Sequence, residues 1–157
     1  FLTGILYKGK IDATMAFNGA IGGLVSITAE PLAPSMGASI LIGAIGGMLV
    51  VVTVPLLDKL RIDDVVGAIP AHLVCGIWGT MIVPFSYAND IGLNEAGNPS
   101  YFGQFVGVAA CAIFVSVVSA VVWLALKMTT GVRPTEEEEI MGLDKSEIGL
   151  EAYPEFS

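Results

Sequence analysis

The amino-acid sequence predicts an all-α membrane protein, a polytopic bundle of transmembrane helices. Hydrophobic residues make up 54% of the 157 positions and charged residues only 14%, whereas soluble domains carry roughly 25% charged residues. The apolar residues gather in four stretches that reach, or nearly reach, the length of about 20 residues that a helix needs to cross a hydrocarbon layer. Glycines recur inside these stretches at helical spacing, which is typical of helices packed closely within a membrane.

The four expected spans are separated by segments rich in turn-forming residues. EPLAPS, DKLRIDD and NDIGLNEAGNPS join the spans in order. The first span is the shortest, and the last is long enough to tilt or to extend beyond the bilayer. We place the spans at Ala13–Ala29, Met36–Leu57, Val65–Ser86 and Tyr101–Leu126, within a transmembrane domain of residues 1–131 that precedes a polar tail at 132–157.

The first ten residues, FLTGILYKGK, have neither the basic n-region nor the cleavage site of a signal peptide. We interpret this opening as the last turn or two of a preceding membrane helix. The sequence therefore predicts further spans upstream.

Positive charges predict the orientation, because Lys and Arg favour cytoplasmic loops. If all four stretches cross the membrane, every Lys and Arg falls on one side, and EPLAPS and NDIGLNEAGNPS contain neither residue. Both ends of this segment are therefore expected in the cytoplasm. The basic residues are Lys8, Lys10, Lys59, Arg61, Lys127, Arg133 and Lys145.

Charge and cysteine content exclude several functional classes. The net charge of −8 arises largely from carboxylates near the C-terminus, and the 7 basic residues are scattered, so no nucleic-acid surface is expected. Cys75 and Cys111 lie in apolar stretches without the spacing of a metal or redox pair. We interpret both as small buried hydrophobic residues. The sequence thus predicts no metal, no cofactor and no enzyme activity.

His72 is the only histidine, and it lies within AHLVCGIWGT, about two turns or roughly 10 Å into the third span. An ionisable residue inside a membrane usually faces a bundle interior or a polar pathway. Two interpretations stay open on these grounds: a neutral structural imidazole bonded to a neighbouring helix, or a group on a conduction path. A haem or metal site would need further ligands, and the chain has no second histidine to supply them.

Three blocks resemble the ammonium transporters of the Amt/Mep/Rh superfamily, in their bacterial branch. They run in family order from near the first residue to the last. The most specific feature is the membrane-embedded His72 in an H-x-x-x-G-x-x-G setting, followed by a tail of this form. The blocks are FNGAIGGLVSITAEPL at Phe17–Leu32, LDKLRIDDVVGAIPAHLVCGIWGT at Leu57–Thr80, and GVRPTEEEEIMGLDKSEIGLEAYPEF at Gly131–Phe156.

The resemblance implies that the chain is the C-terminal part of an eleven-helix fold with two inverted halves, assembled as a homotrimer with one pore per subunit in the inner (plasma) membrane. Two histidines from opposite halves meet in a narrow apolar pore in this family, and His72 is similar to the second. Its partner, the aromatic gate and the outer recruitment site would lie outside this chain. Leu73 and Val65 depart from the family pattern, where glycine and proline are common.

The implied function is ammonium transport. Carrying the intact ion through an apolar bore would require stripping its hydration shell, which costs several kcal/mol or more. Ammonia needs only a hydrogen-bonding partner, and an imidazole donates at one nitrogen and accepts at the other. An ammonium sensor of the same fold that signals through its tail is the alternative, and a structural membrane subunit is a third.

Four further polar or aromatic residues are candidates for supporting roles. Asp63 and Asp64 precede its span, where carboxylates cap the free backbone donors of a helix, and the resemblance gives Asp64 a supporting role in holding the His72 helix. Asn18 is expected to bond across a helix contact. Trp78 fits packing and pore lining equally well.

The tail begins with Gly131, a flexible residue, and continues into an acidic run. Thr135 and Glu138 have the spacing of a capping box, which predicts a short helix ending near Gly142. The acidic composition alone is also compatible with a solvated segment. The resemblance implies an arm that docks on the neighbouring subunit and contributes to binding a PII-type nitrogen signal protein, with Tyr153 in EAYPEF as part of it.

Overall fold

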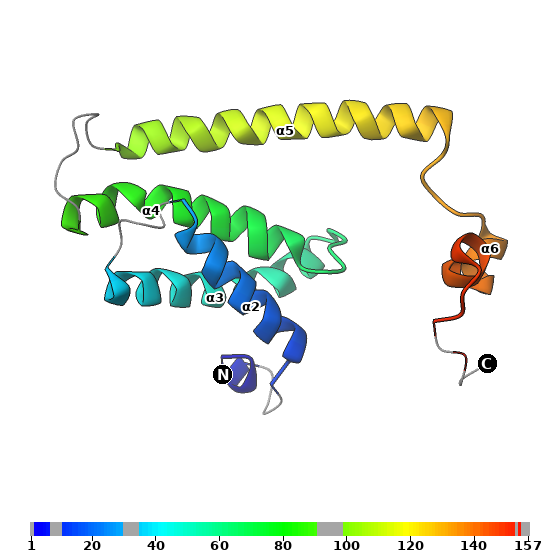
Figure 1. Cartoon of the computed structure of the whole chain (residues 1–157), viewed down its shortest axis with the longest axis horizontal. Helices are drawn as coiled ribbons and strands as arrows, with labels where there is room; N and C mark the ends of the chain where they lie inside the picture. Colours follow the sequence, from blue (N-terminus) through cyan, green and yellow to red (C-terminus); the bar gives the residue numbers. More distant parts are fainter. Residues whose placement is uncertain (1, 7–10, 30–34, 91–98, 153, 155–157) are drawn as a thin grey trace. The chain divides into compact units, whose positions relative to one another are not determined.

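The computed structural model describes residues 2–6, 11–29, 35–90, 99–152 and 154, with backbone only for residues 86–90. All regular secondary structure within these ranges is helical, which confirms the predicted all-α class. The elements are α1 (Leu2–Leu6), α2 (Ala13–Ile27), α3 (Met36–Lys59), the π-helical segment η1 (Ile69–Val74), α4 (Cys75–Asp90), α5 (Tyr101–Thr129), α6 (Glu136–Met141) and the π-helical segment η2 (Asp144–Ile148) (Figure 1).

Two of the helices in the described ranges, α3 and α5, are long and apolar enough to cross a membrane, with mean hydropathies of 2.5 and 2.6. Helix α2 and the stretch Ile69–Phe85 are apolar but shorter. Helices α2, α3 and α5 begin at the residues where the sequence places its first, second and fourth spans. The number of crossings stays a prediction.

Side-chain caps fix the starts of α2 and α3. The carboxylate of Asp12 accepts a hydrogen bond from the Met15 amide at 3.0 Å, and the Ser35 hydroxyl accepts one from the Ala38 amide at 3.3 Å. Both bonds satisfy backbone donors that the first turn of a helix leaves free.

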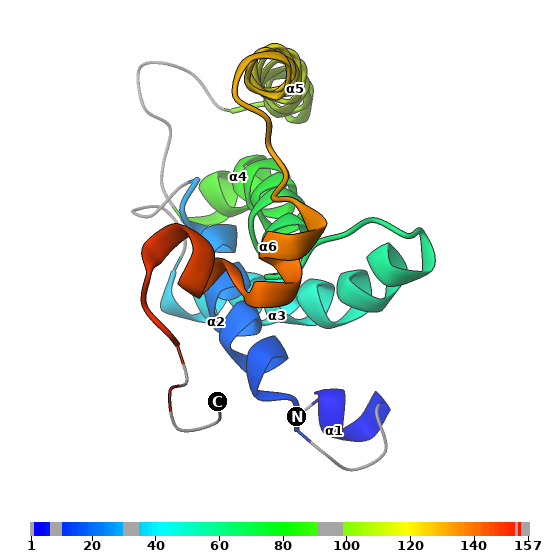
Figure 2. The same cartoon turned by 90° about the vertical axis from the view of Figure 1, so that its right-hand side faces the viewer.

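The chain divides into two compact units, residues 1–111 and 112–157, and α5 continues from the first into the second. In the first unit, α2, α3 and the continuous η1–α4 helix each pack against the other two (Figures 1 and 2). This three-helix arrangement presents His72.

Glycines make the crossing of α2 and α3 unusually close. A Cβ built at Gly23 would lie 3.2 Å from the Gly43 carbonyl oxygen, and one built at Gly19 would lie 3.9 Å from the Gly47 carbonyl oxygen. Helix α4 approaches α2 in the same way, since a Cβ at Gly79 would overlap the backbone of Ser26. The predicted role of these glycines in helix packing is confirmed.

The core between the three helices is small and includes one of the two cysteines. Val50 and Cys75 are each 0% exposed, and Ser26 is 1% exposed. Burial of Cys75 agrees with the prediction, whereas Cys111 on α5 is exposed in this structure, so the prediction was wrong for that residue. The sequence pattern misled because apolar neighbours surround Cys111 on a helix that has no buried residue in the described structure.

Candidate functional site

The helix that carries His72 begins at Ile69, later than the predicted start at Val65. The reason is a turn before it, in which Gly67 has φ +73°, a conformation that a residue with a side chain rarely adopts. Apolar residues continue through this turn, so the apolar pattern alone predicts a helix start that is too early.

Asp64 ties this turn to the first amides of η1. Its Oδ1 accepts from the Ala68 amide and its Oδ2 accepts from the Ile69 amide, both at 2.8 Å. The carboxylate therefore satisfies two backbone donors at the start of an apolar helix, where the first amides lack acceptors within the helix. The predicted capping role is confirmed for Asp64, whereas Asp63 makes no such bond to any residue that the structure describes.

Asn18 ties the same turn to α2. Its Nδ2 donates to the Val66 carbonyl oxygen at 2.9 Å, so the predicted bond across a helix contact is present, although its acceptor lies in a turn. Asn18 and Asp64 thus hold opposite ends of the segment that leads into η1.

A cavity of about 460 Å³ opens beside this turn. Its polar lining includes two carboxylates, from Asp12 and Asp64, together with Thr14 and Asn18, and no Lys or Arg among the described residues lines it. A lining with this charge favours cations over anions near the turn.

His72 lies within η1 and its ring is exposed. Ala71 and Cys75 on the same helix are buried, at 2% and 0% exposure, whereas Leu73 is 51% exposed, so His72 lies beside the packed face of the helix. The ring makes no hydrogen bond to another described residue, and the structural interpretation of the imidazole therefore finds no partner in this part of the chain. Short π-helical segments occur frequently at functional sites.

Trp78 lies farther along the same helix and is bonded to α3. Its Nε1 donates to the Ile42 carbonyl oxygen at 3.1 Å. This contact supports the packing interpretation of Trp78, and pore lining stays a prediction.

Sequence reasoning missed a second side-chain bond between α4 and α3. The Cys75 thiol donates to the Gly46 carbonyl oxygen at 3.3 Å. A signal was present, because Cys75 and Trp78 are three residues apart and therefore share a helix face.

The second unit contains the tail, whose short helix α6 begins with the predicted capping box. The Thr135 amide donates to Glu138 Oε2 at 2.8 Å, and the Glu138 amide donates to Thr135 Oγ1 at 3.3 Å, which completes the capping box. The Thr135 amide and hydroxyl both donate to Glu138 Oε2, and these two bonds lower the pKa of Glu138. Helix α6 ends at Met141 before Gly142, as predicted, and Gly131 has φ +79°.

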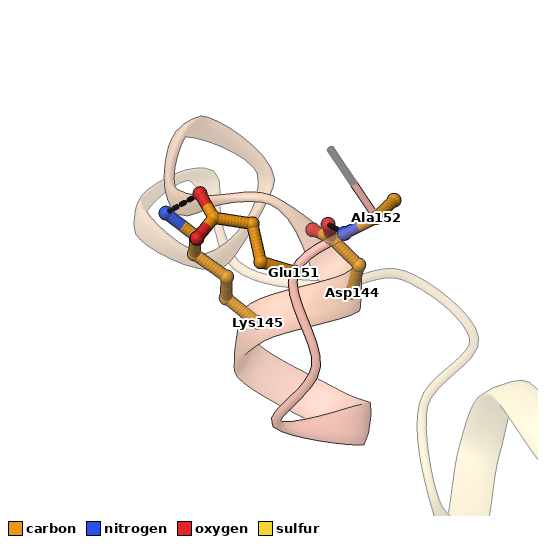
Figure 3. A network of polar contacts seen from close by, with 4 residues as sticks. All are labelled: Asp144, Lys145, Glu151 and Ala152. Atoms are coloured by element: carbon orange, nitrogen blue, oxygen red, sulfur yellow. Dashed lines mark hydrogen bonds and ion pairs between the residues drawn. The ribbon is translucent and has the colours of Figure 1, made fainter. Parts of the chain in front are cut away.

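After α6 the tail folds back on η2 (Figure 3). Asp144 Oδ2 accepts from the Ala152 amide at 2.8 Å, and Lys145 pairs with Glu151 at 2.5 Å. The bond from Ala152 lowers the pKa of Asp144, and the bond to Glu151 raises the pKa of Lys145. The sequence did not indicate this closure, and Tyr153 lies outside the described residues.

Comparison with known proteins gives consistent matches along the chain. The sequence profile described as the Ammonium Transporter Family matches residues 1–153. The chain is 35% identical over 151 residues to ammonium transporter Amt1 of Haloferax mediterranei, covering 96% of the chain and 28% of that protein. It is 36% identical over 164 residues to ammonium transporter Amt2 of Archaeoglobus fulgidus, covering 96% and 35%.

A eukaryotic protein matches over a similar range. Ammonium transporter 1 of Dictyostelium discoideum is 34% identical over 160 residues, which covers 96% of the chain and 34% of that protein. The chain spans about a third of the length of the curated relatives it matches.

Proposed function

Because the chain belongs to the ammonium transporter family, we propose that it acts in ammonium transport across a membrane, as part of a pathway that conducts ammonia past His72. The observation that carries the proposal is the exposed imidazole of His72, presented by a fixed turn on an apolar helix and without a hydrogen-bond partner among the described residues.

The chemistry of the cargo explains why an imidazole suits this position. Ammonium gives up its proton to a relay that includes the His72 ring, and the neutral ammonia then avoids the desolvation cost of an ion in the apolar bore. The His72 ring then offers hydrogen bonds of both kinds to ammonia. Potassium has no proton to release, so the same bore excludes it.

Three neighbours support His72 in this proposal. Asp64 and Asn18 hold the turn that precedes η1 through the bonds described above. Trp78 contributes either as a packing residue or as part of the pore lining.

The cellular setting follows the family pattern. We place the protein in the inner (plasma) membrane of a bacterium, as a homotrimer with several crossings per subunit and both ends of this segment in the cytoplasm. The tail, with Gly131, Glu138 and Tyr153, docks on a neighbouring subunit and takes part in binding a PII-type signal protein.

An ammonium sensor is the second candidate function. The observation that favours it is the folded structure of the tail, which the capping box and the Asp144–Ala152 bond hold together. A sensor would bind ammonium and change its tail without carrying useful flux.

The test uses the longest open reading frame that contains these 157 residues, called here the full reading frame. Purified protein in liposomes should give ammonium-dependent uptake, and His72→Ala should lower it by more than about tenfold, as expected when a group that moves or holds a proton is removed. Leu73→Ala, which alters the exposed neighbour, is the control and should transport normally. Ammonium binding without uptake would favour the sensor, and neither binding nor uptake would contradict both.

A further inference from the structure

We infer that Cys75 and Trp78 are positioning residues, which hold α4 against α3 through two side-chain donors and thereby set where η1 presents His72. The inference rests on the proposed function of His72, and it concerns two side chains that lie between α4 and α3.

The two donors and their acceptors form a matched pair along the two helices. Cys75 Sγ donates to the Gly46 carbonyl oxygen at 3.3 Å, and Trp78 Nε1 donates to the Ile42 carbonyl oxygen at 3.1 Å. The donors are three residues apart on α4 and the acceptors four apart on α3, so each pair lies on one helix face. Together the bonds fix both the height and the rotation of α4 on α3.

Cys75 also connects these two bonds between α4 and α3 to His72. Its backbone N–H bonds the carbonyl oxygens of His72 and Pro70, so it closes the π-helical turn that holds the ring. Its side chain is 0% exposed and bonded to α3. A shift of Cys75 relative to α3 is therefore transmitted directly to the backbone of His72.

The location of the two acceptors indicates that these bonds contribute more to the position of α4 on α3 than to the stability of the fold. The carbonyls of Ile42 and Gly46 lie inside α3, where helix carbonyls already accept from the residue four positions later. Removing a donor from α4 therefore leaves neither of these two α3 carbonyls unpaired. The fold should persist, whereas the position of η1 and His72 relative to α3 should become less fixed.

The experiment measures the reactivity of the His72 ring in the full reading frame. Diethyl pyrocarbonate modifies exposed neutral imidazole, and peptide-mapping mass spectrometry reports its rate at His72 alone. The test variants are Cys75→Ala, Trp78→Phe and the double variant, and Cys75→Ser is the rescue variant because a hydroxyl keeps a donor. Each is accompanied by ammonium uptake in liposomes and by the elution profile of the assembled protein.

The chain supplies a matched control for each change. Cys111 and Trp123 both lie on α5 and are exposed, and their side chains make no hydrogen bond to another described residue. Cys111→Ala and Trp123→Phe should therefore leave the rate at His72 unchanged.

The double variant should change the modification rate of His72 by about fivefold or more, the size expected for the loss of a net hydrogen bond, and Cys75→Ser should return it to near the original rate. An unchanged rate in an assembled double variant, or an equal change in the control variants, would overturn the inference. If the double variant does not assemble, Trp78→Phe alone is compared with Trp123→Phe on the same terms. A changed rate with unchanged uptake would support the positioning role and contradict the proposed part of His72 in transport.

Discussion

The side-chain amide of Asn18 lies directly against Gly67, so that a Cβ at position 67 would be 2.6 Å from Asn18 Nδ2. Gly67 also has φ +73°. The contact joins α2 to the turn that begins the His72 helix, and it depends on the absence of a side chain at this position.

Gly67→Ala is expected to destabilise the protein. A side chain in this backbone conformation costs about 1–3 kcal/mol, and the new Cβ would also displace the amide that bonds Val66. Thermal unfolding in detergent should show a lower midpoint. Gly37→Ala is the control, since a Cβ there meets nothing within 4 Å, and it should be neutral or slightly stabilising. Equal midpoints for the two variants would contradict the assigned role of Gly67.

Gly79→Ala should separate α4 from α2. Its Cβ would overlap the backbone of Ser26, which cannot move like the end of a flexible side chain. Overpacking of this kind costs about 1–3 kcal/mol, so the midpoint of thermal unfolding should fall. Gly107→Ala, where a Cβ has open space, should be neutral or stabilising. The packing described for α2 and α4 is wrong if both variants behave alike.

Much of the first unit could be predicted from local sequence. The helical spacing of Gly19, Gly23, Gly43 and Gly47 predicted close packing, because small residues decide helix contacts in membranes. The Asp64 cap, and in the second unit the Thr135–Glu138 box, could be predicted because they depend on residues a few positions apart.

Other features depend on contacts between distant residues, which periodicity does not report. The Cys75–Gly46 and Trp78–Ile42 bonds join residues 29 and 36 positions apart. The turn at Gly67 is apolar, so hydropathy extended the helix through it. The closure of Asp144 on Ala152 uses a backbone amide, which no side-chain pattern indicates.

Acidification is expected to open the tail between Asp144 and Ala152. The Ala152 amide holds the pKa of Asp144 below its usual value, so the bond adds stability above the ordinary pKa of an aspartate and loses it as pH falls through the depressed pKa. Hydrogen exchange of the tail, corrected for the intrinsic pH dependence of exchange, should show reduced protection of Ala152 in that window. Asp144→Asn should abolish this pH dependence, and a persistent dependence in the variant would assign it to another group.

The topology can be tested by cysteine labelling in a Cys111→Ala background. The distribution of Lys and Arg predicts that Ser100 and Glu147 lie on opposite sides of the membrane. A membrane-impermeant maleimide applied to intact cells should therefore label Ser100→Cys, and should label Glu147→Cys only after the cells are opened. Labelling of both sites in intact cells would contradict an odd number of crossings between them.

His72→Glu separates conduction from packing. If the ring lines an ammonia pathway, a carboxylate in the bore can hold a cation, and the assembled variant should pass potassium while its selectivity for ammonium falls. If the ring is instead a buried structural partner, the same change leaves an uncompensated charge that costs about 3–5 kcal/mol, and the protein should fail to assemble. The measurements are recovery of the assembled protein in detergent and ammonium and potassium currents in liposomes, with Leu73→Glu as the control for adding a charge at the next exposed position. A well-assembled His72→Glu protein with unchanged currents would mean that His72 lies away from the pathway.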